Sequence, residues 1–499
     1  MRFDLAESRF VDAHLRPEAP AVIAADATLS WRELAASAAV WCDAARAEGF
    51  GRDVPVIVRG HKEAGFFVAM AGALMLGAPF VPVDTVYPDE RMRRIARTLA
   101  ASAYFDARTG RFERLDGDAE PAEGHTRAPA LRETNLAYVQ FTSGTTGDPK
   151  GVQIGREGVA SLAEWMNLDF ALGPSPVFLN QAPFSFDLSM YEVFGTLALG
   201  GTIVMMSRAA CMPGAAFIEA LAQARVTSWV STPSFAQQQL LDPRFEQASL
   251  PSLSTFLFCG ETLPVSLARR LRQRFPGARI INTYGPTEAT VAATWIVVDD
   301  AVLEAHPVRL PIGFSRRGGE VFIDQNELCI AGPYVMRGYL NRADLNATKM
   351  FERDGGRAFR AGDVGDVDAD GLLFCHGRMD DQVKLNGYRI ELAEIDSALA
   401  AMPGGAHAAA VPLRRADGSV ARIVAFVETG ANDERGAQLA LPSDWRVRLG
   451  ERLPPYMIPS ELIACRMLPL TVNAKIDRAR LAEDYRNAMM ASQSNGNGR

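Results

Sequence analysis

The segment YVQFTSGTTGDPKGV, residues 138–152, joins the end of an apolar run to small, hydroxyl-bearing and cationic residues. Tyr138 and Phe141 are typical of a buried strand. The glycines and Pro149 that follow cannot continue this strand, so the chain turns directly after it. Backbone N–H groups, hydroxyls and Lys150 then form a suitable cradle for phosphate oxygens. Composition alone leaves open a solvated linker rich in Ser, Thr and Gly.

Length and composition indicate a soluble enzyme-sized chain with at least two domains. The chain has 499 residues, of which 48% are hydrophobic and 22% charged. The net charge of −7 argues against a nucleic-acid partner held by phosphate contacts. The six cysteines form no C-x-x-C pair, and the N-terminus is acidic where a signal peptide needs an apolar run. We therefore expect reduced cysteines in a cytoplasmic protein.

Residues 64–83 form an uncharged stretch about as long as a membrane span. Glycines and prolines interrupt the stretch repeatedly, which favours a buried helix followed by a strand. We therefore expect a protein that is not embedded in a membrane.

Strands and helices alternate most clearly between Phe178 and Val298. The pattern predicts a strand near Trp229, a helix over 233–241, a strand over 255–258, a helix over 265–275 and a strand over 279–283. Short crossovers of this kind imply a parallel sheet. Three unusual turns follow the carboxyl ends of these strands, where open α/β sheets bind ligands. The turns are 231–233, 260–262 and 284–288.

The fold class predicted is α/β, with a large N-terminal domain of parallel βα sheets over residues 1–379. Beyond Pro311 short strands and turns indicate a small β-rich subdomain, and residues 311–328 suggest a short hairpin. A compact α+β domain follows over 380–490. Residues 491–499 are polar and rich in Gly, Asn and Ser, which predicts a disordered tail.

Several motifs occur in one order along nearly the whole chain. They are FTSGTTGDPKG, FSFDLS, NTYGPTEAT, ELCIAGPYVMRGYLN, FRAGD, GRMDDQVKLNGYRIELAEI and TVNAKIDR. Together they resemble the adenylate-forming (ANL) superfamily, which includes acyl-CoA synthetases and amino acid adenylation enzymes. STPSF, FLFCGETLPVS and NTYGPTEATVA resemble most the branch of D-alanine:carrier protein ligases.

The resemblance implies that a carboxylate attacks the α-phosphate of ATP to give an acyl-adenylate, and that a thiol then displaces AMP. Thr287 would bond the α-phosphate, Glu288 would hold Mg²⁺, and Lys475 would bridge the substrate carboxylate and the α-phosphate. The other residues implied to bind ATP are Thr142, Ser143, Gly144, Thr145, Thr146, Lys150, Gly260, Glu261, Asn282, Thr283, Tyr284, Gly285, Pro286, Asp363 and Arg378.

Two of these residues have specific roles in the implied site. Tyr284 would stack on adenine, and Asp363 would accept both ribose hydroxyls, as one carboxylate can. A turn aspartate remains the alternative for Asp363, and a surface ion pair remains the alternative for Arg378.

Asp187 separates amino acids from other acids, because the resemblance implies that it binds the α-ammonium. An unpaired buried carboxylate costs about 3–5 kcal/mol, so fatty and aryl acids should be rejected. The alternative is that Asp187 caps the helix that begins near Leu188. The remaining positions implied to line the pocket are Leu188, Tyr191, Val230, Leu257, Cys259, Thr283, Val291 and Ala292. This mostly apolar set, with no second charge, favours a small aliphatic side chain.

The resemblance implies a hinge at Asp380, about which the C-terminal domain rotates between the two steps. No carrier segment follows Lys475, so we expect a separate phosphopantetheinylated carrier protein as partner. The predicted function is ATP-dependent activation of a small amino acid, D-alanine, and its transfer to that carrier.

Three alternatives remain open. A stand-alone adenylation enzyme could load another small amino acid in nonribosomal-peptide-type biosynthesis. Asp187 disfavours an acyl-CoA ligase. The presence of Lys475, Glu288 and Asp363 disfavours a catalytically silent scaffold.

Overall fold

A computed structural model of the protein describes residues 2–11, 17–115, 130–144, 149–402, 408–415, 418–428, 442–465, 467–470 and 476–496. The chain divides into two compact units. The first comprises Met1–Thr85, Ile95–Thr142 and Lys150–Met379. The second comprises Val86–Arg94, Ser143–Pro149 and Asp380–Arg499.

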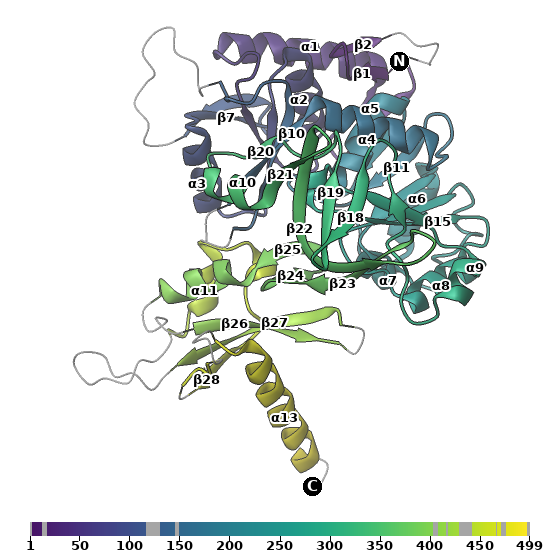
Figure 1. The fold of residues 1–499 in the computed structure, drawn as a ribbon. Helices are drawn as coiled ribbons and strands as arrows, with labels where there is room; N and C mark the ends of the chain where they lie inside the picture. The colour runs from purple at the N-terminus through teal and green to yellow at the C-terminus, as the bar shows by residue number, and fades with distance from the viewer. Residues whose placement is uncertain are drawn as a thin grey trace. The chain divides into compact units, whose positions relative to one another are not determined.

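A nine-stranded sheet of the first unit holds the strands expected from the β/α alternation (Figure 1). Its order is β17-β16-β15-β14-β13-β11-β12-β3-β4, and the neighbours from β15 to β3 are parallel. The strands are β3 (Pro20–Ile23), β4 (Thr28–Ser30), β11 (Val177–Asn180), β12 (Thr202–Met205), β13 (Ser228–Ser231), β14 (Thr255–Phe258), β15 (Arg279–Tyr284), β16 (Thr294–Val297) and β17 (Phe314–Ser315). The prediction of a parallel sheet in this region is confirmed.

A seven-stranded sheet contains strands from both ends of the segment 138–152. Its order is β20-β10-β9-β6-β5-β7-β8, with β9 and β10 antiparallel. The strands are β5 (Val56–Gly60), β6 (Phe80–Asp84), β7 (Ala103–Asp106), β8 (Arg111–Arg114), β9 (Leu136–Thr142), β10 (Lys150–Gly155) and β20 (Gly338–Tyr339). β9 ends at Thr142 and β10 begins at Lys150, so the predicted phosphate segment connects these two strands.

The β-rich part of the first unit is a five-stranded sheet, and a two-stranded ribbon of β1 (Arg2–Asp4) and β2 (Arg9–Val11) lies near the N-terminus of the chain. The five strands are β18 (Glu320–Asp324), β19 (Glu327–Ala331), β21 (Met350–Arg353), β22 (Gly356–Val367) and β23 (Leu373–Arg378). β18 and β19 pair as a hairpin through Gln325 and Asn326, whose φ values are 52° and 66°. Asn accepts this left-handed conformation more readily than most residues, and the expected short hairpin is confirmed.

Helices join the strands of the first unit, and several of them connect parallel strands. They are α1 (Trp31–Ala47), α2 (Ala64–Leu76), α4 (Arg156–Leu168), α5 (Met190–Leu199), α6 (Ala215–Gln223), α7 (Pro233–Gln239), α8 (Val265–Arg274), α9 (Asp300–Ala305) and α10 (Ala343–Lys349). A further helix, α3 (Asp89–Leu99), begins in the second unit and ends in the first. Short 3₁₀ turns, η1 (Asp187–Ser189) and η2 (Thr287–Ala289), precede α5 and β16.

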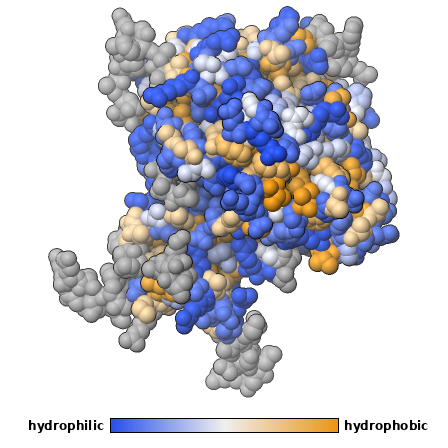
Figure 2. All heavy atoms as spheres, viewed as in Figure 1, coloured by the Kyte–Doolittle hydropathy of each residue, from blue (hydrophilic) through white to orange (hydrophobic). Residues whose placement is uncertain are grey.

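The uncharged stretch after residue 63 is a buried helix, α2, followed by strand β6, as the sequence predicts. Among the described residues no helix has both the length and the apolar character needed to cross a bilayer. The face drawn in Figure 2 carries many hydrophilic side chains, and its apolar side chains lie in interrupted groups.

A dense aromatic core supports the sheet behind the strand ends. The ring of Trp229 lies 5.0 Å from that of Phe245, which lies 4.9 Å from Phe275. Each fully buried side chain of this kind stabilises the fold by about 1.5–3 kcal/mol. This packing therefore holds the strands of the sheet, and with them the turns at their carboxyl ends, in fixed positions.

The second unit contains the hairpin β24 (Gln382–Leu385) and β25 (Tyr388–Glu391) and the sheet β26-β27-β28. The latter strands are Ala408–Arg414, Val420–Glu428 and Leu462–Cys465. Its helices are α11 (Leu392–Ala400), α12 (Trp445–Gly450) and α13 (Arg478–Gly496), with a 3₁₀ turn η3 (Pro455–Met457). Helix α13 extends to Gly496, so it includes part of the stretch for which the sequence predicts a disordered tail.

Candidate active site

The three predicted ligand turns follow adjacent parallel strands of the first unit. Ser231 at the end of β13 pairs with Phe258 at the end of β14, and Phe258 pairs with Asn282 near the end of β15. The turns after these strands therefore lie at one edge of the sheet. This is the edge at which open α/β sheets bind ligands.

Tyr284, Asp363 and Arg378 form one hydrogen-bonded group. The Tyr284 hydroxyl donates to Asp363 Oδ2 at 2.6 Å, and Arg378 Nη1 lies 3.4 Å from Asp363 Oδ1. Arg378 also donates to the Ala361 carbonyl at 2.7 Å. Burial, followed by the nearby Asp363 carboxylate, raises the pKa of Tyr284 well above its usual value. The tyrosine therefore stays protonated and orients the carboxylate predicted to hold ribose.

Gly362 is required beside this group. Its φ is 75°, and a Cβ built there would lie 2.7 Å from Arg378 Nη2. A side chain at this position would be strained and would displace the guanidinium. The glycine of the FRAGD motif thus permits the contact between Arg378 and Asp363.

A second group contains Glu288 from η2, Tyr339 from β20 and Lys150 from β10. The Tyr339 hydroxyl donates to Glu288 Oε1 at 2.6 Å, and Lys150 Nζ lies 5.8 Å from the centre of the Tyr339 ring. Glu288 is fully buried, and its carbonyl accepts from Met336 N at 2.8 Å. Across the β9–β10 ladder Lys150 pairs with Thr142. The structure therefore brings Glu288 together with the Lys150 side of the predicted phosphate segment.

The donor set around Glu288 fits a magnesium ion that is shared with phosphates. Within the described ranges no three Asp, Glu, His or Cys side chains gather as a metal site. Mg²⁺ is commonly bound through one or two carboxylates plus phosphate oxygens and water, and it does not need a protein cage. One buried carboxylate next to a predicted phosphate site is compatible with that mode.

Asp187 lies in the 3₁₀ turn η1 and is 8% exposed. The N-cap of α5 is Ser189, without a capping hydrogen bond from its side chain, so Asp187 does not occupy the helix cap. Burial mainly, with a contribution from the Asp187 charge, raises the pKa values of Tyr138 and Tyr191 well above normal. The charge of Asp187 thus acts on two buried phenols, and a carboxylate buried to this extent favours pairing with a cation.

The other residues of the predicted amino-acid pocket are also brought together. Tyr191 donates to Thr283 Oγ1 at 3.3 Å, and Thr283 donates to the Phe258 carbonyl at 2.8 Å. Cys259 Sγ lies 3.8 Å from the Val291 carbonyl.

The strand pairing and the turns place four more of the predicted pocket residues. Val230 pairs with Leu257 across β13 and β14, and η1, which includes Leu188, packs against β13. A Cβ at Gly285 would lie 2.4 Å from Ala292 Cα, so this glycine allows the turn containing Ala292 to approach β15.

A buried polar network frames the segment that carries Asp187. Lys62 Nζ donates to Asn180 Oδ1 and to the Ala182 carbonyl, and it lies 4.7 Å from the centre of the Phe184 ring. Asn180 Nδ2 donates to Glu192 Oε1 at 3.2 Å. Burial lowers the pKa of Lys62 to about 8 and raises that of Glu192 to about 8. The network fixes both ends of the stretch from Ala182 to Glu192.

Two of the residues predicted to contact the base have partners inside the protein. Asn282 Nδ2 donates to the Pro311 carbonyl at 2.9 Å. Glu261 Oε2 accepts from Ser234 N at 3.0 Å, at the start of α7. Gly260 has a φ of 89°, which a residue with a side chain rarely adopts.

The remaining predicted residues lie in the second unit or outside the described residues. Ser143 and Gly144 belong to the second unit, where Ser143 Oγ donates to the Arg389 carbonyl at 2.9 Å. Thr145, Thr146 and Lys475 lie outside the described residues.

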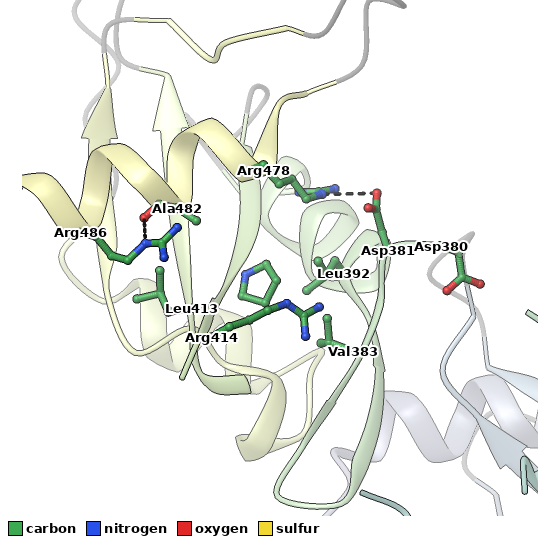
Figure 3. Close-up of a pocket in the computed structure, with 11 residues that line it drawn as sticks. Asp380, Asp381, Val383, Leu392, Leu413, Arg414, Arg478, Ala482 and Arg486 are labelled. Atoms are coloured by element: carbon green, nitrogen blue, oxygen red, sulfur yellow. Dashed lines mark hydrogen bonds and ion pairs between the residues drawn. The ribbon is translucent and has the colours of Figure 1, made fainter. Parts of the chain in front are cut away.

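The second unit has its own cavity of about 330 Å³, drawn in Figure 3. The predicted hinge residue Asp380 lines it. Arg478, at the start of α13, directs its guanidinium toward Asp381, with Nε 3.4 Å from Oδ2 (Figure 3). Arg478 also donates to Asp396 Oδ2 at 2.6 Å and to the Ala410 carbonyl at 2.8 Å. These contacts tie the start of α13 to α11 and β26, three residues after Lys475 in the sequence.

Tyr339, Lys62 and Glu192 have no role predicted from the sequence. Tyr339 falls within the quoted motif ELCIAGPYVMRGYLN, but the motif does not show that its hydroxyl contacts Glu288. Lys62 and Asn180 are 118 residues apart, and no local pattern links them.

Comparisons with known proteins agree with this geometry. Residues 10–340 match the family described as AMP-binding enzyme, and residues 394–475 match the AMP-binding enzyme C-terminal domain. The chain is 37% identical over 498 residues to the D-alanine--D-alanyl carrier protein ligase of Bacillus velezensis, covering 95% of this chain and 97% of that protein. Identity to the same-named ligase of Lactiplantibacillus plantarum is 40% over 446 residues, covering 85% and 87%.

A solved structure shares the fold. It is the adenylation domain AlmE of Vibrio cholerae in complex with glycyl-adenosine-5'-phosphate. The TM-score is 0.79 at 23% identity, and the match covers 97% of both chains.

Proposed function

The chain belongs to the AMP-binding enzyme family, and from this premise we propose that it activates D-alanine as its adenylate. It then transfers the aminoacyl group to the phosphopantetheine thiol of a separate carrier protein. In the first step a carboxylate oxygen of the amino acid bonds to the α-phosphorus of ATP and pyrophosphate leaves. In the second step the thiol sulfur bonds to the acyl carbon and AMP leaves.

One observation carries the choice of an amino acid as substrate. Asp187 is a buried carboxylate, and the other residues predicted to line the amino-acid pocket are mostly apolar. An ammonium placed there gains a charged hydrogen bond in a site of low dielectric. The small apolar remainder suits a methyl side chain, and the relatives at 37–40% identity are D-alanine ligases.

On the nucleotide side, Asp363 is oriented for the ribose hydroxyls. One of its oxygens accepts from Tyr284 at 2.6 Å, which fixes the plane of the carboxylate. Each carboxylate oxygen accepts more than one hydrogen bond, so both remain able to accept from ribose. Arg378 holds the opposite side of Asp363 through Oδ1.

On the phosphate side, Thr142 and Lys150 lie side by side at the ends of β9 and β10 and contribute a hydroxyl and a cation. Thr287 follows β15 at the start of η2 and bonds the α-phosphate in this proposal. Glu288, held by Tyr339, is the residue that would hold Mg²⁺. When bound, that ion neutralises charge on the phosphate oxygens.

Lys475 and Asp380 complete the proposal from the second unit. Lys475 would contact the substrate carboxylate and the α-phosphate during adenylation, and Asp380 would act as the hinge between the two half-reactions. In this proposal the reaction takes place in the cytoplasm, because it consumes ATP.

The proposal is tested by amino-acid-dependent exchange of labelled pyrophosphate into ATP. D-Alanine, L-alanine, glycine, serine and β-alanine are compared with an aryl acid. We expect D-alanine to give the highest kcat/KM and the aryl acid to give none. Exchange with the aryl acid but with no amino acid would refute the proposal. If another amino acid gave the highest kcat/KM, the proposed adenylation and transfer would stand, but D-alanine would be the wrong substrate.

A further inference from the structure

The turn that follows η2 has an unusual backbone. Thr290 has a φ of 50° and Val291 a φ of 75°, so two consecutive β-branched residues adopt the left-handed region. Such residues are rarely found there, because their side chains crowd the backbone. Val291 and the following Ala292 are residues of the predicted amino-acid pocket.

One buried side chain reaches the carbonyls on both sides of Val291. Arg316 Nη1 donates to the Ala292 carbonyl at 2.8 Å and lies 3.4 Å from the Thr290 carbonyl. Its backbone N–H donates to the Ala293 carbonyl at 2.8 Å. The guanidinium therefore holds the turn from one side.

Two further contacts fasten the same turn. Thr290 Oγ1 donates to the Tyr334 carbonyl at 2.7 Å. Cys259 Sγ lies 3.8 Å from the Val291 carbonyl, which connects the turn to another pocket residue. The left-handed backbone is thus fixed by several side chains at once, as a strained functional segment requires.

Arg316 itself is completely buried, with 0% of its surface exposed. Nη2 donates to Ser161 Oγ at 2.9 Å. The guanidinium lies 3.7 Å from the Tyr334 ring centre and 5.0 Å from that of Trp165. Its partners among the described residues are carbonyls, a hydroxyl and aromatic rings. Burying a cation in this way is costly, so a purely apolar side chain would fill the same space at lower cost.

We propose that Arg316 is a positioning residue for substrate specificity. By holding the carbonyls of Thr290 and Ala292, it keeps Val291 and Ala292 in the conformation that sets the size of the amino-acid pocket. The inference rests on the proposed function, because that function makes these two residues a wall of the pocket. Arg316 does not touch the substrate and acts through the turn.

The test compares Arg316→Lys and Arg316→Met with a matched control, Arg317→Met. Arg317 is the neighbouring residue, its side chain is 63% exposed, and it lies 3.4 Å from Asp169. The measured quantity is the ratio of kcat/KM for D-alanine to that for glycine and for D-valine, in pyrophosphate exchange. This ratio does not depend on the fraction of folded enzyme, so a loss of stability alone leaves it unchanged.

We expect both Arg316 variants to change at least one ratio by about tenfold, since one methylene in an apolar pocket is worth about 10- to 200-fold. The Arg317 control should keep the ratios of the parent enzyme. Equal losses for all three amino acids would mean that Arg316 is only structural, and would overturn the inference.

If the Arg316 variants do not fold, Ser161→Ala provides a milder test. It removes one acceptor of the guanidinium without touching the turn, and should change the same ratio by about threefold. An unchanged ratio in this variant would overturn the inference. Failure of the proposed function gives a different result, because then the parent enzyme shows no amino-acid-dependent exchange.

Discussion

Replacing Asp187 by Asn tests whether the buried carboxylate binds the substrate ammonium. Asn has nearly the same shape, so the pocket keeps its volume while losing one negative charge. Asp187 is only 8% exposed, and solvent therefore cannot replace the missing partner. Removing one member of a buried ion pair costs about 3–5 kcal/mol. At about 1.4 kcal/mol per factor of ten, kcat/KM for D-alanine should fall at least 100-fold.

A substrate without the ammonium completes this experiment as a double-mutant cycle. Propionate keeps the carboxylate and the methyl group of alanine but has no amine. Its low rate with the parent enzyme should stay the same or rise in Asp187→Asn, because an unpaired buried anion has been removed. Asp169→Asn, which changes an aspartate beside exposed Arg317, serves as a control. A loss below fivefold with D-alanine, or an equal loss with propionate, would refute the ammonium-binding role.

Three other variants test the rest of the site. Tyr284→Phe removes the 2.6 Å hydrogen bond to Asp363, so KM for ATP should rise about 10- to 100-fold while KM for the amino acid is unchanged. Lys62→Met should lower Tm, and more at pH 8 than at pH 5. The reason is that burial raises the pKa of Glu192 to about 8, above its unfolded value. Its carboxyl is therefore neutral at pH 5 and partly ionised at pH 8, and only the ionised form gains from the charge of Lys62. Chelation by EDTA should abolish pyrophosphate exchange reversibly, and Glu288→Gln should raise the Mg²⁺ concentration for half-maximal rate about tenfold; an unchanged Mg²⁺ dependence would contradict that assignment.

The strands and helices around the site could be predicted because local pattern determines them. The expected strand over 255–258 is β14, and the helix expected over 265–275 is α8, Val265–Arg274. Since parallel strands align their carboxyl ends, the turns after them were expected to lie together.

The supporting side chains could not be predicted in the same way. Arg316 and Arg317 are adjacent and identical in type, yet one is fully buried and the other has a largely exposed side chain. Only the course of the backbone in three dimensions separates them. The partner of Arg316, Ser161, lies 155 residues away, and no periodicity of the sequence marks that pair.

Under the proposed function, two buried charges near the predicted pocket residues give a physical reason for a preference for amino acids. Asp187 and Arg316 both act on the pKa values of Tyr138 and Tyr191, the anion raising them and the cation lowering them. One buried charge of each sign therefore acts on the region of the predicted pocket residues. An amino acid is a zwitterion, so its binding leaves the total charge of this region unchanged. A fatty or aryl acid would add a net negative charge in a region of low dielectric, which costs several kcal/mol. Under the proposed function, discrimination against simple acids therefore depends on charge balance as well as on the contact between Asp187 and the ammonium.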